Sequence, residues 1–551
     1  MQIESEIVSV NFPQMQEDIR RKFTRNKRRI PDWRINEPPA RLETACELYL
    51  SGSNYISTRN EVKCMSNQGE KKGVGALDFF CIGFGAIVGV GWAVAINGWM
   101  ASSGGPVPAA IGYLLCLLVM VPFGLVYAEL VPMLPVAGGG SAFAYAAFGE
   151  KIAFLSGWAA FGGFVFIIPW EAIQVTDVLG YLFPALVSGK PLYTILGADV
   201  HLTTIIIGTI CTILLFLLNK RGLSSAAALQ KFLCVFLVAA AVIGAIAGLI
   251  GGSFENLQPY YDNTVKEGVT HSSMLGGAFS IMVTAAFFLA GFETIPQGIE
   301  EAGGDVKKVG GTVVLSVGLA CVFYAILLFC FGYGYDWIDF QSLDRPAAAN
   351  MFLDIFPGGA GTALYWLLTI GALAGLFTTW NGFFTASANL LMAMGRSRMI
   401  PGWFAKQDKN GIAINGLYVV TILSFIGPFA GANAIDTVTT FSAVAFILSW
   451  MISSLSLLKL RKDMPNVERP YKLATPIAVW AAIAGVIYFV GSLLPFTPFF
   501  AGKKALIVFV IYLVVGLILF VAAGGERNKM SSHERMKNMF GDLDLDAMRN
   551  K

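Results

Sequence analysis

The chain has 551 residues, of which 55% are hydrophobic and only 14% are charged, and its mean hydropathy is +0.64. This composition excludes an ordinary soluble globular protein, and runs of about 20 apolar residues recur along most of the length, as membrane-spanning helices require. A formal net charge of +3 gives no support to nucleic-acid binding. Three histidines and eight scattered cysteines, without a CxxC pair, argue against a metal centre or a disulfide framework.

Residues 1–72 are polar and contain no cleavable signal pattern. A basic cluster within them has two open interpretations: a cytoplasmic tail that follows the positive-inside rule, or a contact with anionic lipid headgroups. The cluster consists of Arg20, Arg21, Lys22, Arg25, Lys27, Arg28 and Arg29. We expect residues 1–72 to form a cytoplasmic N-terminal tail.

Twelve apolar segments predict an all-α polytopic membrane protein with about 12 transmembrane helices. They cover 74–101, 107–132, 152–183, 200–218, 226–251, 275–299, 311–335, 360–395, 415–432, 437–459, 475–495 and 504–523. Basic pairs such as Lys220-Arg221 and Lys307-Lys308 follow even-numbered spans, whereas Lys503-Lys504 is an exception. Because cytoplasmic loops carry the basic excess, we expect both termini in the cytoplasm, in a multi-pass protein of the plasma (or bacterial inner) membrane.

The first span contains an unusual concentration of glycine. Its central stretch reads Gly83-Phe84-Gly85-Ala86-Ile87-Val88-Gly89-Val90-Gly91-Trp92, with four glycines in nine residues. Glycine is a poor helix former, and a broken helix survives in the bilayer only where it lines a cavity or meets a ligand. We therefore expect this stretch to be unwound toward a ligand. The alternative is close helix–helix packing, which small residues also serve.

The sixth span contains a second interruption. It reads Phe287-Phe288-Leu289-Ala290-Gly291-Phe292-Glu293-Thr294-Ile295-Pro296-Gln297-Gly298, and it resumes as a short piece that ends near Glu300-Glu301. Glycine, an embedded carboxyl and proline follow one another closely here. Interrupted helices at matching positions in two halves of a chain indicate a binding site near the bilayer midplane.

These motifs resemble those of the amino acid–polyamine–organocation superfamily of secondary transporters, and the resemblance covers the chain from Gly73 to about Gly525. Five segments carry it in the family's order: Gly85–Gly91, Pro135–Ser141 with Tyr145 and Gly149, Phe288–Glu293 with Glu300-Glu301, Met394–Pro401, and Arg469–Tyr471. The resemblance implies a leucine-transporter-like five-plus-five inverted repeat with discontinuous helices 1 and 6, working by alternating access. The halves would be 73–251 and 252–460, followed by two further helices at 461–525 and a cytoplasmic C-terminal tail at 526–551.

An amino acid offers a carboxylate and an ammonium group to such a site. N–H groups at a helix interruption favour an anion, and glycine lets a ligand approach closely. We assign the carboxylate to the N–H groups of Val88, Gly89, Val90 and Gly91. We assign the ammonium to the carbonyls of Ala86, Ile87, Phe288, Leu289 and Ala290. Phe292 is either a gate or a packing residue, and Trp92 and Phe292 are candidates for side-chain selectivity.

Two carboxyl groups lie inside predicted spans. Glu293 is a candidate for coupling, either as a proton carrier or as a neutral structural acceptor, because an intramembrane carboxyl is a functional candidate by default. The role of Glu171 stays open between coupling and pairing with a neighbouring helix.

Sodium is the other candidate coupling ion. In some relatives a lysine of helix five replaces it. Matching Gly222 and Gln230 to that family's pattern puts Leu237 at the lysine's position, and Lys231 lies on another helical face. Five oxygens could hold a sodium ion: the carbonyls of Gly85, Val88 and Gly375, and the hydroxyls of Thr378 and Thr379. Threonine hydroxyls also commonly bond back to helix carbonyls, so proton coupling or exchange stays open.

We expect a secondary active transporter of amino acids or related amines, cation-coupled or exchanging, with no cofactor other than Na⁺ or H⁺. Its partners would be the small-molecule substrate and the lipid bilayer; the sequence leaves the oligomeric state open. The alternatives are a proton-coupled or antiporting polyamine carrier and a non-transporting amino-acid sensor. A membrane enzyme would need clusters of His, Cys or Asp, and a channel would need symmetric pore rings, and the sequence shows neither.

Overall fold

The computed structural model describes residues 73–549, except 196, 267–268, 270, 304–305, 432–434 and 498. The N-terminal tail predicted at 1–72, with its basic cluster, lies outside the described residues.

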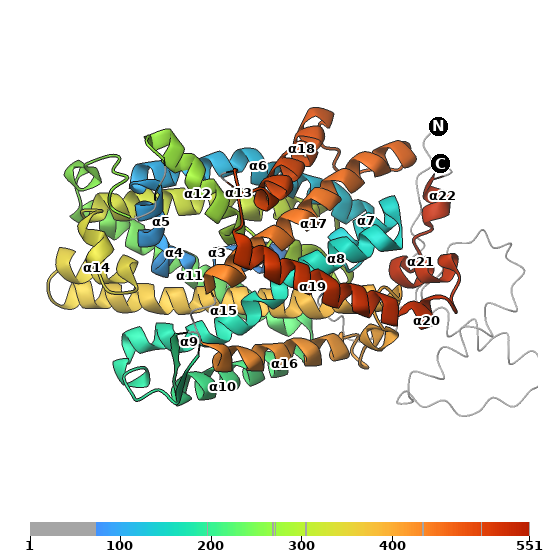
Figure 1. The fold of residues 1–551 in the computed structure, drawn as a ribbon, viewed down its shortest axis with the longest axis horizontal. Helices are drawn as coiled ribbons and strands as arrows, with labels where there is room; N and C mark the ends of the chain where they lie inside the picture. Colours follow the sequence, from blue (N-terminus) through green and yellow to red (C-terminus); the bar gives the residue numbers. More distant parts are fainter. Residues whose placement is uncertain are drawn as a thin grey trace, which may run out of the picture. The chain divides into compact units, whose positions relative to one another are not determined.

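Within the described ranges, ten helices are long and apolar enough to cross a membrane. They are Ala76–Val94, Pro106–Met133, Glu150–Leu182, Leu202–Asn219, Leu223–Gly251, Val306–Gly334, Gly359–Arg396, Thr437–Asp463, Thr475–Leu493 and Lys503–Ala522. A pair of helices, Met274–Met282 and Ala285–Glu301, is bent by 49°, and Ile414–Ala430 is a shorter apolar helix. The ten helices, the bent pair and the shorter helix correspond to the twelve predicted spans, so the all-α polytopic membrane fold is confirmed (Figure 1).

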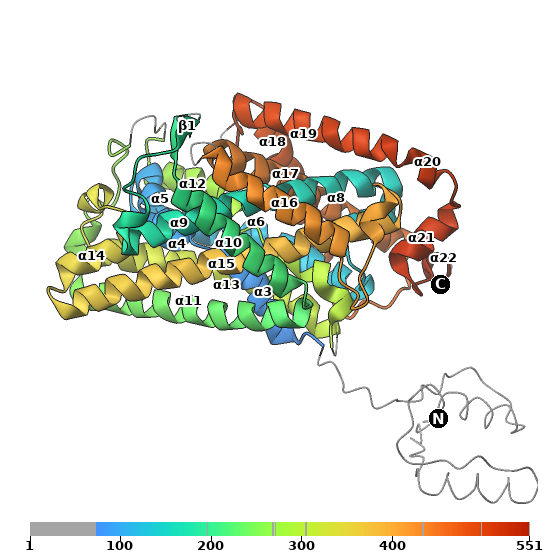
Figure 2. The same ribbon diagram turned by 90° about the horizontal axis from the view of Figure 1, so that it is seen from below.

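The long unbroken helices carry the labels of Figure 1. They are α6 (Pro106–Met133), α10 (Leu202–Asn219), α11 (Leu223–Gly251), α13 (Val306–Gly334), α15 (Gly359–Arg396), α16 (Ile414–Ala430), α17 (Ile435–Asp463), α18 (Thr475–Leu493) and α19 (Lys503–Ala522). Both views show α10 and α16 side by side (Figures 1 and 2), and the two helices are in contact.

The first span consists of three short helices, α3 (Ala76–Val88), α4 (Gly91–Val94) and α5 (Ile96–Ser103). The helix therefore breaks at Gly89-Val90, which we call the first break, and Gly89 has a φ of +47°. The predicted discontinuity is confirmed, but its extent was wrong because α3 stays helical through Gly83 and Gly85. A Cβ at Gly83 would lie 2.5 Å from Cδ1 of Ile295, so this glycine serves close packing, as the alternative interpretation held.

The sixth span is interrupted as predicted. Helix α12 (Met274–Phe288) ends before Leu289–Gly291, which we call the second break, and a 3₁₀ segment, η3 (Phe292–Glu301), follows. Gly291 adopts a φ of +140°, which is a conformation that favours glycine. Pro296 lies inside η3 and cannot donate a backbone hydrogen bond there.

Several helices were not predicted. The third span is two helices, α8 (Glu150–Val165) and α9 (Ile167–Leu182), and α7 (Gly140–Phe148) precedes it. The other unpredicted elements are α14 (Ala347–Ile355), α20 (Gly524–Arg527), α21 (Ser532–Phe540) and α22 (Leu545–Arg549), the two strands β1 (Tyr193–Ile195) and β2 (Ala198–Val200), and the 3₁₀ turns η1 (Pro184–Leu186), η2 (Phe254–Leu257), η4 (Asp339–Ser342) and η5 (Gly402–Ala405).

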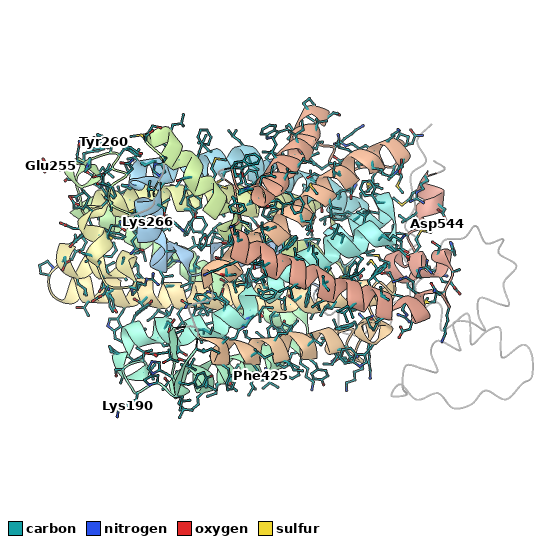
Figure 3. All side chains as sticks on the ribbon, viewed as in Figure 1. Lys190, Glu255, Tyr260, Lys266, Phe425 and Asp544 are labelled. Carbon is teal, nitrogen blue, oxygen red and sulfur yellow. The ribbon has the colours of Figure 1, made fainter. Side chains whose placement is uncertain are left out.

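Two of the loops lie at the end of the helices opposite the C-terminal segment. In Figure 3, Lys190, Glu255, Tyr260 and Lys266 lie at one end, and Asp544 of the C-terminal segment lies at the other. The loops after the third and fifth spans therefore lie opposite the C-terminus, as the predicted alternation requires. The inverted relationship between 73–251 and 252–460 stays a prediction.

Helix α3 occupies the interior of the bundle. It contacts α11, α13, α15 and η3, so the two interrupted spans touch each other. By contrast, only 22% of the most apolar 18-residue stretch of α19 is buried inside the protein, as expected of a helix that faces lipid.

Candidate functional site

The second break packs through its backbone against the last turn of α3, directly before the first break. A Cβ at Gly291 would lie 2.7 Å from the backbone nitrogen of Ile87 and 2.8 Å from the carbonyl carbon of Ala86. Only glycine therefore fits at this position of the second break. The contact brings together two groups of residues that the sequence assigned to one binding site, Ala86–Gly91 and Phe288–Phe292.

A tyrosine from another helix engages the end of α3. The hydroxyl of Tyr324, on α13, lies 2.7 Å from the carbonyl oxygen of Val88 and 3.1 Å from that of Ile87. The last carbonyls of a helix have no partner within the helix, so the first break is what makes these two oxygens available. Sequence reasoning missed Tyr324, which stands in an apolar run without a local signal.

Helix α15 packs on the other side of the first break. A Cβ at Gly375 would lie 2.0 Å from the carbonyl oxygen of Gly89, and a Cβ at Gly89 would lie 2.7 Å from Oγ1 of Thr379. Gly91, at the start of α4, is equally confined, because a Cβ there would lie 2.9 Å from the ring of Phe288.

The structure brings most of the candidate sodium ligands together. Thr378 Oγ1 donates to the Gly375 carbonyl at 2.7 Å, and Thr379 Oγ1 lies 3.2 Å from that oxygen and 3.4 Å from the Gly85 carbonyl. The Val88 carbonyl accepts from Tyr324 instead. The other four oxygens, those of Gly85, Gly375, Thr378 and Thr379, are of the kind that binds a small hard cation. In this structure, however, both threonine hydroxyls bond to helix carbonyls, as the alternative interpretation describes.

The position aligned with the coupling lysine carries an apolar side chain. Cδ1 of Leu237 would lie 2.6 Å from a Cβ at Gly375, so Leu237 lies beside the candidate cation ligands and supplies no charge. Lys231 forms an ion pair with Asp78 at 2.7 Å, which joins α11 to the beginning of α3.

Glu293 stabilises the second break. Its Oε2 accepts the backbone N–H of Gly291 at 2.7 Å, and its Oε1 accepts the indole N–H of Trp450, on α17. Phe292 stacks on Trp450 with ring centroids 5.5 Å apart and meets Tyr127 edge-on at 5.3 Å. The carboxyl therefore has two donors, and Phe292 is fully buried between aromatic rings in this conformation.

Glu171 lies elsewhere, on α9. It is 4% exposed, and its Oε2 has no hydrogen-bond partner among the residues that the structure describes. Among the described residues, no hydrogen bond or ion pair joins it to either break.

Aromatic rings cover the breaks on the side of α5. Trp99 lies 4.7 Å from Phe288, 5.2 Å from Tyr113 and 5.2 Å from Tyr324, measured between ring centroids. Tyr113, on α6, lies 5.0 Å from Tyr324. We call these four residues the aromatic cluster.

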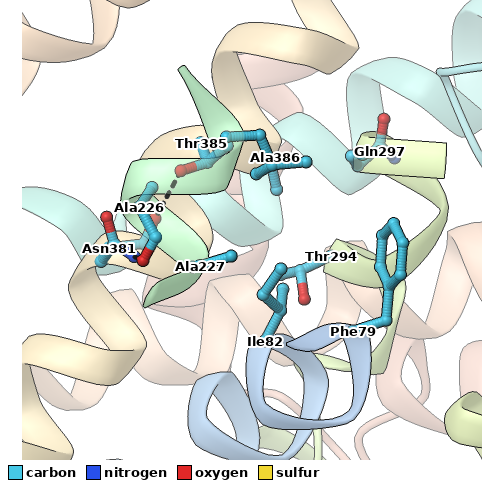
Figure 4. A pocket seen from close by; sticks show the side chains of 12 residues that line it. Phe79, Ile82, Ala226, Ala227, Thr294, Gln297, Asn381, Thr385 and Ala386 are labelled. Carbon is cyan, nitrogen blue, oxygen red and sulfur yellow. Dashed lines mark hydrogen bonds between the residues drawn. The ribbon is translucent and has the colours of Figure 1, made fainter. Parts of the chain in front are cut away.

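A narrow cavity lies on the opposite side of the breaks, toward the beginning of α3. Its lining comes from α3, α11, η3 and α15, and Figure 4 shows Phe79, Ile82, Thr294, Gln297, Asn381 and Thr385 around it. A second cavity shares Leu223 and Thr385 with the first and extends to Asn219, beside the turn that carries Lys220 and Arg221. In this conformation the aromatic cluster closes one side of the breaks, and cavities lie on the other.

A chain of buried amide side chains beside this cavity joins α10 and α11 to α15, and sequence reasoning missed it as well. Nε2 of Gln230 donates to the Thr378 carbonyl at 2.9 Å, Asn381 donates to Gln230 at 2.9 Å, and Asn219 donates to Asn381 at 3.0 Å. The signal that could have found it is the presence of amide side chains inside apolar runs, which marks functional positions in membrane helices.

Two interrupted helices whose backbones meet inside an all-α membrane bundle are typical of secondary transporters. The amino acid permease family model matches residues 74–521, and the chain belongs to this family. The resemblance to the amino acid–polyamine–organocation superfamily is thereby confirmed. The chain is a multi-pass membrane transporter and not an enzyme.

Among its relatives, the branched-chain amino acid permease BcaP of Lactococcus lactis is 24% identical over 82% of this chain and 94% of the relative. An aspartate-proton symporter of Bacillus subtilis is 26% identical over 74% of this chain and 77% of the relative. The arginine/ornithine antiporter ArcD2 of Lactococcus lactis is 22% identical over 54% of this chain and 60% of the relative.

Proposed function

We propose that this chain is a secondary active transporter that carries amino acids or related amines across the plasma membrane by alternating access. The backbone contact between Gly291 and the Ala86-Ile87 peptide carries the proposal, because two interrupted membrane helices in close contact are the arrangement expected around a transporter's binding site. The relatives support it, since their names describe a permease, a symporter and an antiporter of amino acids.

In this proposal backbone groups bind the parts that all amino acids share. N–H groups from Val88 to Gly91 bind the carboxylate, and carbonyls of Ala86, Ile87 and Phe288–Ala290 bind the ammonium. The carbonyl end of α3 carries the negative end of its dipole, which favours a cation there. Phe292 acts as a gate between the breaks and α17.

Coupling uses one of two groups, or the carrier exchanges substrates. A proton would be carried by Glu293, which already accepts two hydrogen bonds at the second break. A sodium ion would be held by Gly85, Gly375, Thr378 and Thr379, joined by the carbonyl of Val88 when Tyr324 releases it. Both termini would lie in the cytoplasm, as the basic loops predict.

The test is uptake by the purified full chain in liposomes. Labelled L-leucine, L-arginine, L-aspartate and putrescine are each offered under a sodium gradient, a pH gradient and exchange against the unlabelled compound. We expect uptake of at least one amino acid in at least one regime. Binding without flux in all three regimes would establish the sensor alternative, and exchange of putrescine alone would establish the polyamine carrier.

The variant Gly89→Leu links the uptake to the first break. The Cβ of the leucine would lie 2.7 Å from Oγ1 of Thr379, and the φ of +47° at this position is one that glycine adopts more easily than other residues. We therefore expect substrate binding to be lost. Gly98→Leu is the matched control, because a Cβ at Gly98, on α5, meets nothing within 4 Å among the described residues. Wild-type affinity in Gly89→Leu would exclude the first break from the binding site.

A further inference from the structure

Tyr324 engages two carbonyl oxygens at the end of α3: that of Ile87, which the proposed function assigns to the substrate's ammonium group, and that of Val88, which it assigns to a sodium ion. Its hydroxyl has one proton and lies 2.7 Å from the Val88 carbonyl and 3.1 Å from the Ile87 carbonyl. Tyr324, Ile87 and Val88 are all buried. An ammonium group that bound at the end of α3 would have to take these acceptors from the tyrosine.

We propose that Tyr324 is a displaceable stand-in for the substrate's ammonium group and thereby sets the affinity of the site. In the absence of substrate, the single hydroxyl proton is shared between these two buried carbonyl oxygens, with the shorter distance to that of Val88. This contact stabilises the site because an unpaired buried acceptor is costly. On binding, the ammonium replaces it, and the hydroxyl rotates away from the first break. This inference rests on the proposed function and assigns one residue of it.

The displaced hydroxyl needs a partner, because it stays buried. Tyr113 offers one: its ring lies 5.0 Å from that of Tyr324, it is fully buried, and its hydroxyl has no hydrogen-bond partner among the described residues. A buried hydroxyl without a partner is unusual in a folded protein. Before substrate binding, the Tyr324 hydroxyl bonds to carbonyls of α3 and the Tyr113 hydroxyl has no partner in the described part of the chain. After binding, the two hydroxyls form a hydrogen bond with each other.

Two other roles for Tyr324 predict different effects on substrate affinity when its hydroxyl is removed. As a direct ligand of the substrate, its hydroxyl would add to affinity, and its removal would weaken binding. As a structural clamp on α3 alone, its removal would lower thermal stability and leave affinity unchanged. Displacement predicts that removal strengthens binding, since the substrate no longer competes with the hydroxyl.

The experiment compares Tyr324→Phe, Tyr113→Phe and the double variant with the wild type in liposomes. The probe is whichever of L-leucine, L-arginine and L-aspartate the wild type takes up with the lowest KM. A net hydrogen bond contributes about 1 kcal/mol, which corresponds to about a fivefold change in affinity. We expect Tyr324→Phe to lower KM by about fivefold, and Tyr113→Phe to raise KM by a similar factor.

The double variant separates displacement from a structural effect of Tyr113. In the Tyr324→Phe background there is no Tyr324 hydroxyl to form a hydrogen bond with that of Tyr113. Tyr113→Phe should therefore leave KM unchanged in that background. Tyr512→Phe is the matched control, since its hydroxyl also donates to a buried helix carbonyl, that of Trp158, at 2.7 Å on α8. That variant should lose thermal stability with no change in KM.

An unchanged or raised KM in Tyr324→Phe, with wild-type uptake present, overturns the inference and leaves the proposed function intact. So does an equal effect of Tyr113→Phe in both backgrounds. A wild-type protein that takes up none of the three amino acids overturns the proposed function, and this inference with it.

Discussion

Gly375 lies so close to Gly89 that a Cβ on the former would be 2.0 Å from the carbonyl oxygen of the latter. Helix α15 thus reaches the first break by backbone contact, without an intervening side chain. The same five-residue stretch of α15 supplies Thr378 and Thr379, whose hydroxyls bond back to the Gly375 carbonyl. The close approach therefore positions both the break and the candidate cation ligands.

Gly375→Ala should separate α15 from the first break. An added methyl group in a packed core costs about 1–3 kcal/mol, because backbone must move to admit it. We expect a lower midpoint of thermal unfolding and at least a tenfold loss of uptake, an order-of-magnitude figure from the same cost. Gly359→Ala, at the beginning of α15, is the control, since a Cβ there meets nothing within 4 Å among the described residues. Equal uptake by the two variants would show that the contact has no role in transport.

The two breaks were predictable because their signals are local. Gly89 and Gly291 adopt positive φ values, and Pro296 removes a backbone donor, and each effect follows from one residue's own chemistry. The same reasoning overreached at Gly83 and Gly85, where glycine serves close packing. Glycine alone does not distinguish the two uses, since only the facing helix decides between them.

The partners of the breaks were not predictable. Tyr324 reaches the site from α13 and lies more than 230 residues from its partner Val88 in the sequence. Trp450 reaches it from α17 and lies more than 150 residues from its partner Glu293. One missed element did have a signal: Ser531 and Glu534 form a capping box at the start of α21, a pattern readable from sequence.

Glu293→Gln tests proton coupling. A glutamine side chain keeps one acceptor oxygen, so either the Gly291 N–H or the Trp450 indole loses its partner, and the variant can no longer exchange a proton. We expect pH-gradient-driven uptake to be lost while exchange of labelled for unlabelled substrate continues. Glu171→Gln is the comparison for the other buried carboxyl: if Glu293 is the group that carries the proton, the Glu171 variant keeps its pH-gradient response. A pH-gradient response retained in Glu293→Gln would remove Glu293 from the coupling step.

Thr378→Val tests the sodium group. Valine keeps the shape of threonine and removes the hydroxyl that bonds the Gly375 carbonyl at 2.7 Å. Where a sodium gradient drives wild-type uptake, we expect the sodium concentration for half-maximal uptake to rise about tenfold, since hydrogen bonds and contacts to charged groups contribute more than neutral ones. Thr369→Val is the control, because its hydroxyl bonds the Tyr365 carbonyl at 2.7 Å in the same helix, away from the breaks. Identical sodium curves for both variants would contradict the assignment.

Glu129→Gln tests a buried charge cluster that holds α6 to the end of α17. Its carboxylate lies 2.5 Å from Arg461 and 3.1 Å from Arg469, and it also accepts the backbone N–H of Leu473 at 2.8 Å. The Glu129 side chain is fully buried, and those of the two arginines are 12% and 4% exposed, so removing the carboxylate leaves positive charge in a buried site. Breaking such a buried pair costs about 3–5 kcal/mol, and we expect a marked fall in the midpoint of thermal unfolding in detergent. Asp463→Asn supplies the comparison: its ion pair with Lys459 is partly exposed, and such pairs contribute at most about 1 kcal/mol. If the two substitutions lowered the midpoint equally, the cluster around Glu129 would not be the stronger anchor between these helices.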